Sequence, residues 1–464
     1  MWGDGEIEQE GTWQPSSASR SAAVDRGSGT PPIGVSQFSA RTTIPTWSFY
    51  ADRQRVLFLA MLFLVTASSY FDYFVLSVLL DPIKQEFQVS DTMLGLLSGL
   101  GFALVYAIAG LPLARWADRG NRRTIISIAL AGWSVMTALC GLAQSFWQLT
   151  AARFGVGALE AGALPPAHSL VADYFPPDRR ATPIAILSMG ASSAGYLLGV
   201  GLGGYLAAKH GWRSALLLAG VPGLLLAAAT RLVLPEPRLR VGFPTLDSQL
   251  DPLSTTFAQL GRKRSYVYIL LGSAFSTVTS SALSMFLPSF MIRTLHVTLG
   301  QVSATWGFAV SGADLVGALV GGWLAGRLSK HDVRWHAWLA GIATVAAIPI
   351  FWLALASRTL SSFLFLDSAA EFLFSIGPPA TFCAIHAVCG DRRRAIAIAI
   401  LQLSFILIGT GLGPLVAGAI SDAFRSLLGE QSLRSSLMMM LAFLIPAAVA
   451  FFWAARALPQ ELEE

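Results

Sequence analysis

Residues 165–180 read PPAHSLVADYFPPDRR, and residues 378–393 read PPATFCAIHAVCGDRR. Both stretches open with Pro-Pro-Ala, and in both an Asp-Arg-Arg triplet begins thirteen residues after the first proline. A weaker similarity links Ala-Asp-Arg at 117–119 with Ala-Gly-Arg at 325–327. Motifs that recur in corresponding positions along a chain indicate an internal repeat. We therefore expect two halves of the same architecture.

Long apolar segments recur on both sides of these stretches. Hydrophobic residues make up 54% of the 464 residues and charged residues 13%, which is too little charge for the surface of a soluble protein. Segments of about 20 apolar residues cross a membrane as helices, and their continuous pattern excludes membrane-spanning strands. The predicted spans are 55–80, 92–114, 124–143, 147–172, 181–206, 213–233, 265–291, 300–325, 335–356, 359–385, 395–420 and 436–457.

Lysine and arginine residues alternate between dense and sparse loops. If the N-terminus lies in the cytoplasm, 21 of the 32 Lys and Arg residues flank the inner ends of the spans and 7 lie in the outer loops. Positive residues accumulate on the cytoplasmic side of a membrane. We therefore expect twelve spans with both termini in the cytoplasm.

Five segments complete the predicted organisation. Residues 1–52 are rich in Ser, Gly, Pro and Thr and lack the apolar core of a signal peptide, so they predict a disordered cytoplasmic tail. Residues 53–233 predict an N-terminal six-helix bundle, and 265–457 a C-terminal one. Between them, 234–264 predicts a central cytoplasmic loop, and 458–464 forms a short tail.

Several function classes do not fit this sequence. It contains no Walker-type phosphate-binding loop, so the chain alone does not use ATP. Its three cysteines, Cys140, Cys383 and Cys389, cannot form a disulfide framework and are expected to be small buried side chains. The net charge of +5 comes largely from the inner loops and does not indicate nucleic-acid binding. We expect neither a metal nor a cofactor.

Residues 114–123, in the loop after the second predicted span, read ARWADRGNRR. This segment resembles the loop signature of the major facilitator superfamily, with Ala114 and Asn121 where that family usually has glycine. The resemblance covers about residues 55–457. It implies an all-α membrane protein of twelve transmembrane helices in two pseudo-symmetric six-helix bundles, which works as a monomer by alternating access.

The first and fourth spans are similar to those of bacterial spinster-like transporters. Residues 153–162 read RFGVGALEAG and lead into the Pro-Pro-Ala stretch, while 70–73 read YFDY, with Tyr73 where that family often has arginine. This resemblance implies a proton-linked carrier of amphiphilic lipids, such as lysophospholipids or phosphorylated sphingoid bases.

Asp72, Arg153 and Glu160 are ionisable residues inside predicted spans, where an unpaired charge is costly. Arg153 and Glu160 are two helical turns apart and so share a face, and a rise of about 1.5 Å per residue places Asp72 level with Arg153. We expect Arg153 to pair with one carboxylate while the other binds a proton, because burial disfavours its charged form. Protonation would release Arg153 toward an anionic headgroup or shift the balance between outward- and inward-open states. A permanent ion pair between the two spans is the alternative.

Four further residues are secondary candidates for the cavity. Asp367 and Glu371 lie four residues apart on the tenth span, and Asp314 lies on the eighth. With no basic residue at their depth, Asp367 or Glu371 is expected to be neutral, either in a second proton or substrate site or in a hydrogen-bonded pair. His168 could relay protons beyond Glu160 or be a structural histidine with a satisfied ring.

Charged residues in two loops predict a cytoplasmic gate. The resemblance implies that Asp118 caps a helix of the C-terminal half, where its negative charge meets a positive helix end. The arginines alone could be membrane anchors, but that interpretation does not explain Asp118. The predicted gate comprises Asp118, Arg119, Arg122, Arg123, Asp173, Arg179 and Arg180.

Small and hydroxylated residues mark three other spans. Glycines at matching positions of spans five and eleven allow close helix approach and predict the interface along which the halves slide. Span seven carries hydroxyl groups that either line a cavity or bind neighbouring helices. These are Ser273, Ser276, Thr277, Thr279, Ser280 and Ser281.

The sequence thus favours a secondary active transporter of the bacterial inner membrane, not an enzyme, with a small-molecule or lipid substrate, protons and membrane lipids as partners. Small organic anions or hydrophobic drugs are the alternative substrates. A receptor that kept the fold would have lost its gate residues. An intramembrane enzyme would need a nucleophile or metal set that His168, Asp173 and His386 do not supply.

Overall fold

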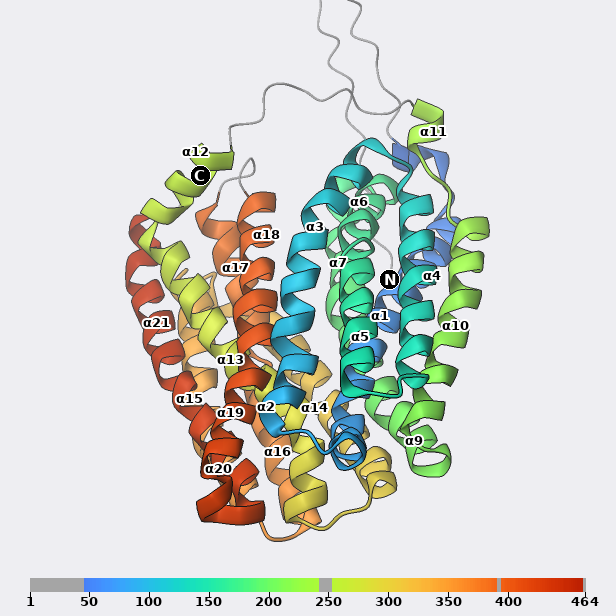
Figure 1. The fold of residues 1–464 in the computed structure, drawn as a ribbon. Coiled ribbons are helices and arrows are strands. Elements are labelled where there is room, and N and C mark those ends of the chain that lie inside the picture. The colour runs from blue at the N-terminus through green and yellow to red at the C-terminus, as the bar shows by residue number, and fades with distance from the viewer. Residues whose placement is uncertain (1–45, 242–252, 390–393, 462–464) are drawn as a thin grey trace, which may run out of the picture. The chain divides into compact units, whose positions relative to one another are not determined.

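The computed structural model describes residues 46–241, 253–389 and 394–461. These residues belong to one compact unit and are almost entirely helical (Figure 1). Residues 1–45 of the predicted 1–52 tail and residues 462–464 of the predicted 458–464 tail lie outside the described residues, as does the second Asp-Arg-Arg triplet at 391–393. The described ends of both predicted tails contain short 3₁₀ turns, at Thr46–Phe49 and Leu458–Gln460. The three cysteines are free.

The first half begins with a short 3₁₀ turn and continues as α-helices interrupted by π-helical stretches at 96–100, 186–190 and 198–203. Its α-helices are α1 (Asp52–Phe87), α2 (Asp91–Gly95), α3 (Gly101–Arg119), α4 (Arg122–Gly141), α5 (Phe146–Glu160), α6 (Leu164–Tyr174), α7 (Ala181–Ala185), α8 (Ala191–Leu197), α9 (Gly204–His210) and α10 (Trp212–Val233).

Two short helices follow, α11 (Arg238–Val241) and α12 (Leu253–Arg262). The second half has a π-helical stretch, η6, at Phe405–Thr410. Its α-helices are α13 (Arg264–Thr294), α14 (Leu299–Leu328), α15 (Trp335–Ala356), α16 (Leu360–Phe374), α17 (Gly377–Val388), α18 (Arg394–Ser404), α19 (Gly411–Leu428), α20 (Ser432–Met440) and α21 (Leu444–Ala457).

The repeated Pro-Pro-Ala motif starts a new helix in each half. Pro165 and Pro166 lie in the first turn of α6, and Pro378 and Pro379 in the first turn of α17. Proline is tolerated there because the first N–H groups of a helix have no partner within it. The fourth and tenth predicted spans are therefore each built from two helices, and the sequence repeat is a structural repeat.

Ten helical stretches in the described part of the chain are long and apolar enough to cross a membrane. One of them, Ile396–Gln460, is 65 residues long and turns back at Gly429, whose φ of 54° favours glycine, so it holds two spans. The predicted span 147–172 is not among the ten, because it is divided between α5 and α6. With these two adjustments the stretches correspond to the twelve expected.

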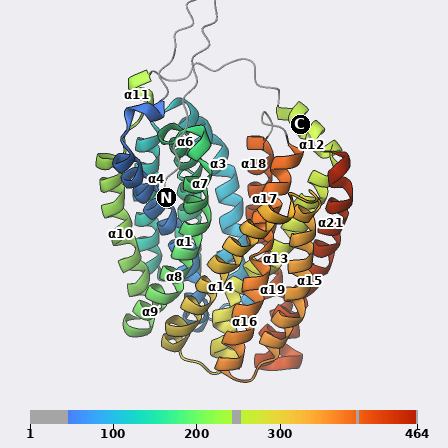
Figure 2. The same cartoon turned by 180° about the vertical axis from the view of Figure 1, so that it is seen from behind.

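The two halves meet mainly where α2 packs on α19, α1 on α13, and α14 on α8 and α9. α2 lies toward one end of the bundle, which we call the α2 end (Figure 1). α11 and α12 lie at the other end, which we call the α11 end (Figures 1 and 2). A Cβ on Gly99 would lie only 2.7 Å from the carbonyl oxygen of Gly411, so glycine permits this crossing. In contrast, Gly195 of span five approaches Phe71 of its own half, so these glycines do not all belong to the interface between the halves.

Candidate functional site

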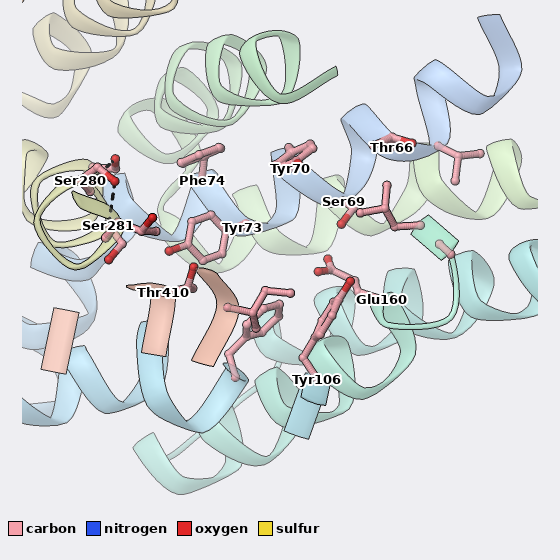
Figure 3. A pocket seen from close by; sticks show the side chains of 17 residues that line it. Thr66, Ser69, Tyr70, Tyr73, Phe74, Tyr106, Glu160, Ser280, Ser281 and Thr410 are labelled. Atoms are coloured by element: carbon pink, nitrogen blue, oxygen red, sulfur yellow. Dashed lines mark hydrogen bonds between the residues drawn. The ribbon is translucent and has the colours of Figure 1, made fainter. Parts of the chain in front are cut away.

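A cavity of about 270 Å³ lies between the two halves (Figure 3). Side chains of α1, α3 and the α5–α6 junction line it from the first half, and side chains of α13 and η6 from the second. The lining residues are Val65, Thr66, Ser69, Tyr70, Tyr73, Phe74, Phe102, Tyr106, Glu160, Ala163, Leu164, Thr277, Ser280, Ser281, Ser284, Ile406 and Thr410.

Glu160 is the one acidic or basic side chain among these described lining residues. It is the last residue of α5, where the helix ends before the Pro-Pro break, and only 3% of it is exposed. Its Oε1 atom is buried without a hydrogen-bond partner. Figure 3 shows the carboxyl group near Ser69 and Tyr106, with Tyr73 and Thr410 farther along the cavity.

Asp72 and Arg153 are buried outside the cavity lining, each with 3% exposed. The Arg153 guanidinium lies over the ring of Phe102, 5.2 Å from its centroid, and Phe102 itself faces the cavity. Arg153 interacts electrostatically with both Asp72 and Glu160, so the structure brings the three predicted residues together.

The direct ion pair predicted between Arg153 and one carboxylate is absent from the described residues, where no nitrogen of Arg153 lies within 4.0 Å of a carboxylate oxygen. Nε and Nη2 of Arg153 and Oδ1 of Asp72 are buried without partners. Burying polar atoms without hydrogen-bond partners costs free energy. Binding of a proton or a substrate, or a rearrangement of these side chains, can supply the missing partners.

The hydroxyl groups of α13 divide into two faces. Thr277, Ser280 and Ser281 line the cavity, and Ser284, which the sequence prediction omitted, continues the same face. The spacing i, i+3, i+4 and i+7 identifies one side of a helix, so it is the sequence signal that could have added Ser284 to the predicted set. Ser273, Ser276 and Thr279 do not line the cavity, and Thr279 donates to the carbonyl oxygen of Met440 at 2.8 Å.

The three secondary acidic candidates lie outside the cavity lining. Asp314 accepts hydrogen bonds from Ser193 at 3.0 Å and from Ser375 at 2.6 Å, and Asp367 accepts one from Trp306 Nε1 at 2.8 Å. Glu371 is half-buried and interacts electrostatically with Asp367 and Asp314. Because Ser193 belongs to the first half, Asp314 also joins the halves.

His168 is half-buried, and its Nε2 atom lies 3.3 Å from the hydroxyl of Ser188. It does not line the cavity that contains Glu160. The structure thus gives His168 a hydrogen-bond partner in its own half.

A charged cluster at the α2 end joins the halves and was missed by the sequence prediction. Arg293 at the end of α13 donates from Nε to Asp81 at 2.6 Å and from Nη1 to both oxygens of Asp91, at 2.9 and 3.0 Å. Lys84 also pairs with Asp91. Asp422 of α19 accepts from the backbone N–H of Asp91 at 3.0 Å, so it helps to cap α2. We call these five residues the α2-end cluster.

Several of the predicted gate residues at the α11 end bond to groups of their own half. Arg122, only 2% exposed, pairs with Asp173 at 2.5 Å and with Glu236 at 2.6 Å. Glu236, absent from the predicted set, also accepts from the backbone N–H of Arg122 at 2.7 Å. No local sequence signal indicates this contact, since 114 residues separate the two partners.

The other gate candidates lie around this buried group. Asp118 and Arg119 are exposed, and the carbonyl oxygen of Asp118 accepts from Arg238 at 3.0 Å. Arg123 donates to the carbonyl oxygen of Leu234 at 3.3 Å, and Arg180 Nε to that of Phe175 at 3.0 Å. Arg179 is exposed at the neighbouring turn.

The family model described as Major Facilitator Superfamily matches residues 62–370 and 269–464. The chain belongs to this superfamily. It is therefore a secondary transporter rather than an enzyme, and the predicted twelve-helix fold is confirmed.

Relatives of this chain within the superfamily differ in their named activities. An "MFS-type efflux pump" of Mycolicibacterium smegmatis is 34% identical over 400 residues, which cover 86% of this chain and 91% of the relative. "Protein spinster homolog 1" of Xenopus laevis is 24% identical over 392 residues, covering 80% of this chain and 74% of the relative.

The structural neighbours include a bacterial homologue of the human lysosomal transporter spinster, solved in an inward-facing and unoccupied conformation. The TM-score is 0.80 at 29% identity, with 89% of this chain and all of the other covered. The occupied inward-facing form of a bacterial homologue gives 0.79 at 28% identity, with 89% of this chain and 100% of that chain covered. The predicted spinster-like relationship is confirmed.

Proposed function

We propose that this transporter is proton-coupled and carries an amphiphilic anion such as a lysophospholipid or a sphingoid phosphate. The observation that carries the proposal is the position of Glu160. Its carboxyl group is buried and lines the cavity between the halves, and its Oε1 atom has no hydrogen-bond partner among the described residues. A carboxyl group in that position can gain or lose a proton when the cavity opens to water.

Proton binding and anion binding at this cavity support each other. A charged Glu160 would repel an anionic headgroup in the low-dielectric space between the halves, whereas the neutral acid would not. By linkage, a bound anion then favours protonation of Glu160 by the same factor. Arg153 would reach the headgroup after a movement of Phe102, which lies between its guanidinium and the cavity.

The lining of the cavity suits a molecule with one polar and one apolar end. Tyr70, Tyr73, Phe74, Phe102 and Tyr106 supply aromatic surface from the first half. The second half presents the hydroxyl face of α13. Aromatic rings bury an acyl or sphingoid chain, and hydroxyl groups hydrogen-bond a headgroup.

We further infer that the α11 end faces the cytoplasm. The distribution of Lys and Arg supports this orientation, and similarity to an inward-facing neighbour supports an inward-open state. The α2-end cluster would then be the closed outer gate. The loop that contains Asp118 would lock the halves only in the opposite, outward-open state.

Small organic anions or hydrophobic drugs are the alternative substrates. The relative named as an efflux pump favours export of the substrate. A relative named "Probable L-galactonate transporter" of Escherichia coli favours a sugar acid. It is 25% identical over 414 residues, which cover 85% of this chain and 87% of that protein. The aromatic lining accommodates a drug as well as a lipid chain.

Reconstituted protein in liposomes tests the proposal. Uptake of a radiolabelled lysophospholipid, a sugar acid and a hydrophobic drug would be measured with and without a pH gradient, together with gradient-independent counterflow. Glu160→Gln should abolish gradient-driven uptake and keep counterflow, because it removes only the titrating charge. Glu430→Gln, an exposed glutamate, is the matched control. Gradient-driven uptake at the normal rate in Glu160→Gln would remove Glu160 from the coupling role.

A further inference from the structure

A second cavity, of about 330 Å³, lies within the first half near the α11 end and shares no lining residue with the cavity between the halves. Its walls come from the segment before α1, from α1 and α4, from the end of α10 and the turn that follows it, and from α11. The lining residues are Phe49, Tyr50, Gln54, Phe58, Arg123, Leu232, Val233, Leu234, Pro235 and Arg240.

The charged residues of this lining are all basic. Arg123 and Arg240 face the cavity, and no acidic side chain is among the described lining residues. The nearby acid Glu236 is occupied, since both of its oxygens bond to Arg122. Exposed Arg231 adds positive charge beside Arg123.

Several donors at this cavity are unused. The Nε atom of Arg123 and the hydroxyl of Tyr50 are buried without hydrogen-bond partners, and Tyr50 is only 5% exposed. Burial raises the pKa of Tyr50, so its phenol keeps its proton and remains a donor. The Arg240 guanidinium contacts only aromatic faces among the described residues, 5.7 Å from the centroids of Phe49 and Tyr50.

We propose that this cavity binds the phosphate of an anionic phospholipid headgroup. Arginine guanidinium groups match phosphate oxygens in charge and in the geometry of their N–H donors, and basic pockets between transmembrane helices are typical headgroup sites. The Tyr50 hydroxyl supplies a further donor.

The apolar part of the wall favours a lipid over a free phosphate ion. Leu232 lines the cavity and is 83% exposed, and Val56, which lies near the start of α1 outside the lining, is 66% exposed. In a membrane protein, exposed apolar side chains at this level of a spanning helix face acyl chains. A lipid with its phosphate at Arg123 and Arg240 can therefore lay its chains along α10 without leaving the bilayer.

Purified full-length protein, stripped of lipid in detergent, provides the test. The melting temperature would be measured against increasing short-chain phosphatidylglycerol, short-chain phosphatidylcholine and inorganic phosphate. Phosphatidylglycerol should give a saturable rise, and the other two little or none. Arg123→Gln and Arg240→Gln should each raise the half-saturating concentration about ten-fold, the effect of one charge-assisted hydrogen bond.

Arg334→Gln is the matched control, because Arg334 is partly exposed in the other half and loses the same charge. Tyr50→Phe keeps the aromatic ring and removes only one donor, so it tests the site even if an arginine variant fails to fold, and it should weaken binding several-fold. An equal response to phosphatidylcholine would overturn the proposal. An equal response to inorganic phosphate would also overturn it, because it would indicate a site for free anions. The proposal would fail as well if Tyr50→Phe and every arginine variant that folds bound phosphatidylglycerol with the affinity of the wild type.

Discussion

The carboxylate of Asp422 accepts hydrogen bonds from both the backbone N–H and the hydroxyl of Thr92, at 2.7 and 2.6 Å. α2 is thus capped by a residue from the other half of the protein. A cap of this kind exists only while the two halves are closed at the α2 end, so it couples the end of a helix to the conformational equilibrium.

Asp422→Ala should therefore favour opening at the α2 end. Loss of an N-cap costs about 1 kcal/mol, which shifts a two-state equilibrium by roughly five-fold. Spin labels at His210, the last residue of α9, and at Leu360, the first residue of α16, would report the distance between the halves at that end. Glu430→Ala, an exposed residue shortly after α19, is the control. An unchanged distance distribution in Asp422→Ala would show that the cap does not contribute to closure.

Arg293→Gln should have a larger effect than the loss of the cap. Its guanidinium pairs with Asp81 and Asp91, whose side chains are 6% and 2% exposed. Its removal therefore leaves two buried carboxylates, of which Asp91 still pairs with Lys84. Breaking a buried ion pair by removing one partner costs about 3–5 kcal/mol. We expect a lower melting temperature and a shift toward the open α2 end.

A second variant, Asp81→Asn, tests whether the effect of Arg293→Gln comes from charge or from packing. Combined with Arg293→Gln, it removes one of the two carboxylates left without their arginine partner, and it should restore part of the lost stability. A double variant as unstable as the sum of the two single variants would contradict an electrostatic role for Arg293.

Sequence patterns predicted the fold and part of the site for physical reasons. Twelve spans follow from the length of a membrane-crossing helix, and two halves from the repeated Pro-Pro-Ala motif, which begins α6 and α17 alike. Three ionisable residues could be recognised as site candidates because a charge inside an apolar span is costly without a partner or a function: Asp72, Arg153 and Glu160. Their placement against the cavity, with only Glu160 in its lining, depends on how helices from both halves pack and has no sequence signal.

The α2-end cluster was missed because its residues lie near the ends of spans. Charged side chains are ordinary there, so Asp81, Lys84 and Arg293 carried no local sign of pairing. The partners are also distant in sequence, since 212 residues separate Arg293 from Asp81. Only the association of the two halves brings them together.

The glycine crossing where Gly99 meets the start of α19 should resist larger side chains. A Cβ on Gly99 would approach the carbonyl oxygens of Gly411 and Thr410 to 2.7 and 2.9 Å, so Gly99→Ala must push the halves apart at that point. We expect slower transport and a larger open fraction at the α2 end by the same spin-label distances. Gly326→Ala is the control, because a Cβ added at Gly326 would meet nothing within 4 Å. Equal transport rates in the two variants would show that this crossing tolerates separation.

Glu461 ties the end of the chain to the start of α13, and this contact should depend on pH. Its carboxylate accepts from the backbone N–H groups of Arg264 and Ser265, at 2.9 and 2.8 Å, and from the Ser265 hydroxyl at 2.6 Å. Partial burial acts to raise the pKa of Glu461, but these hydrogen bonds outweigh it, so the pKa is lowered. A lowered pKa in the folded state means that the charged form stabilises the fold. That stabilisation is complete above the unfolded-state pKa of about 4.3 and is lost as pH falls through the folded-state pKa.

Glu461→Ala should thus lower the melting temperature at pH 7, and the difference from wild type should shrink below pH ~4. The control Glu430→Ala should show no such difference. A difference between wild type and Glu461→Ala that stays constant down to acid pH would assign the contact to packing instead of charge.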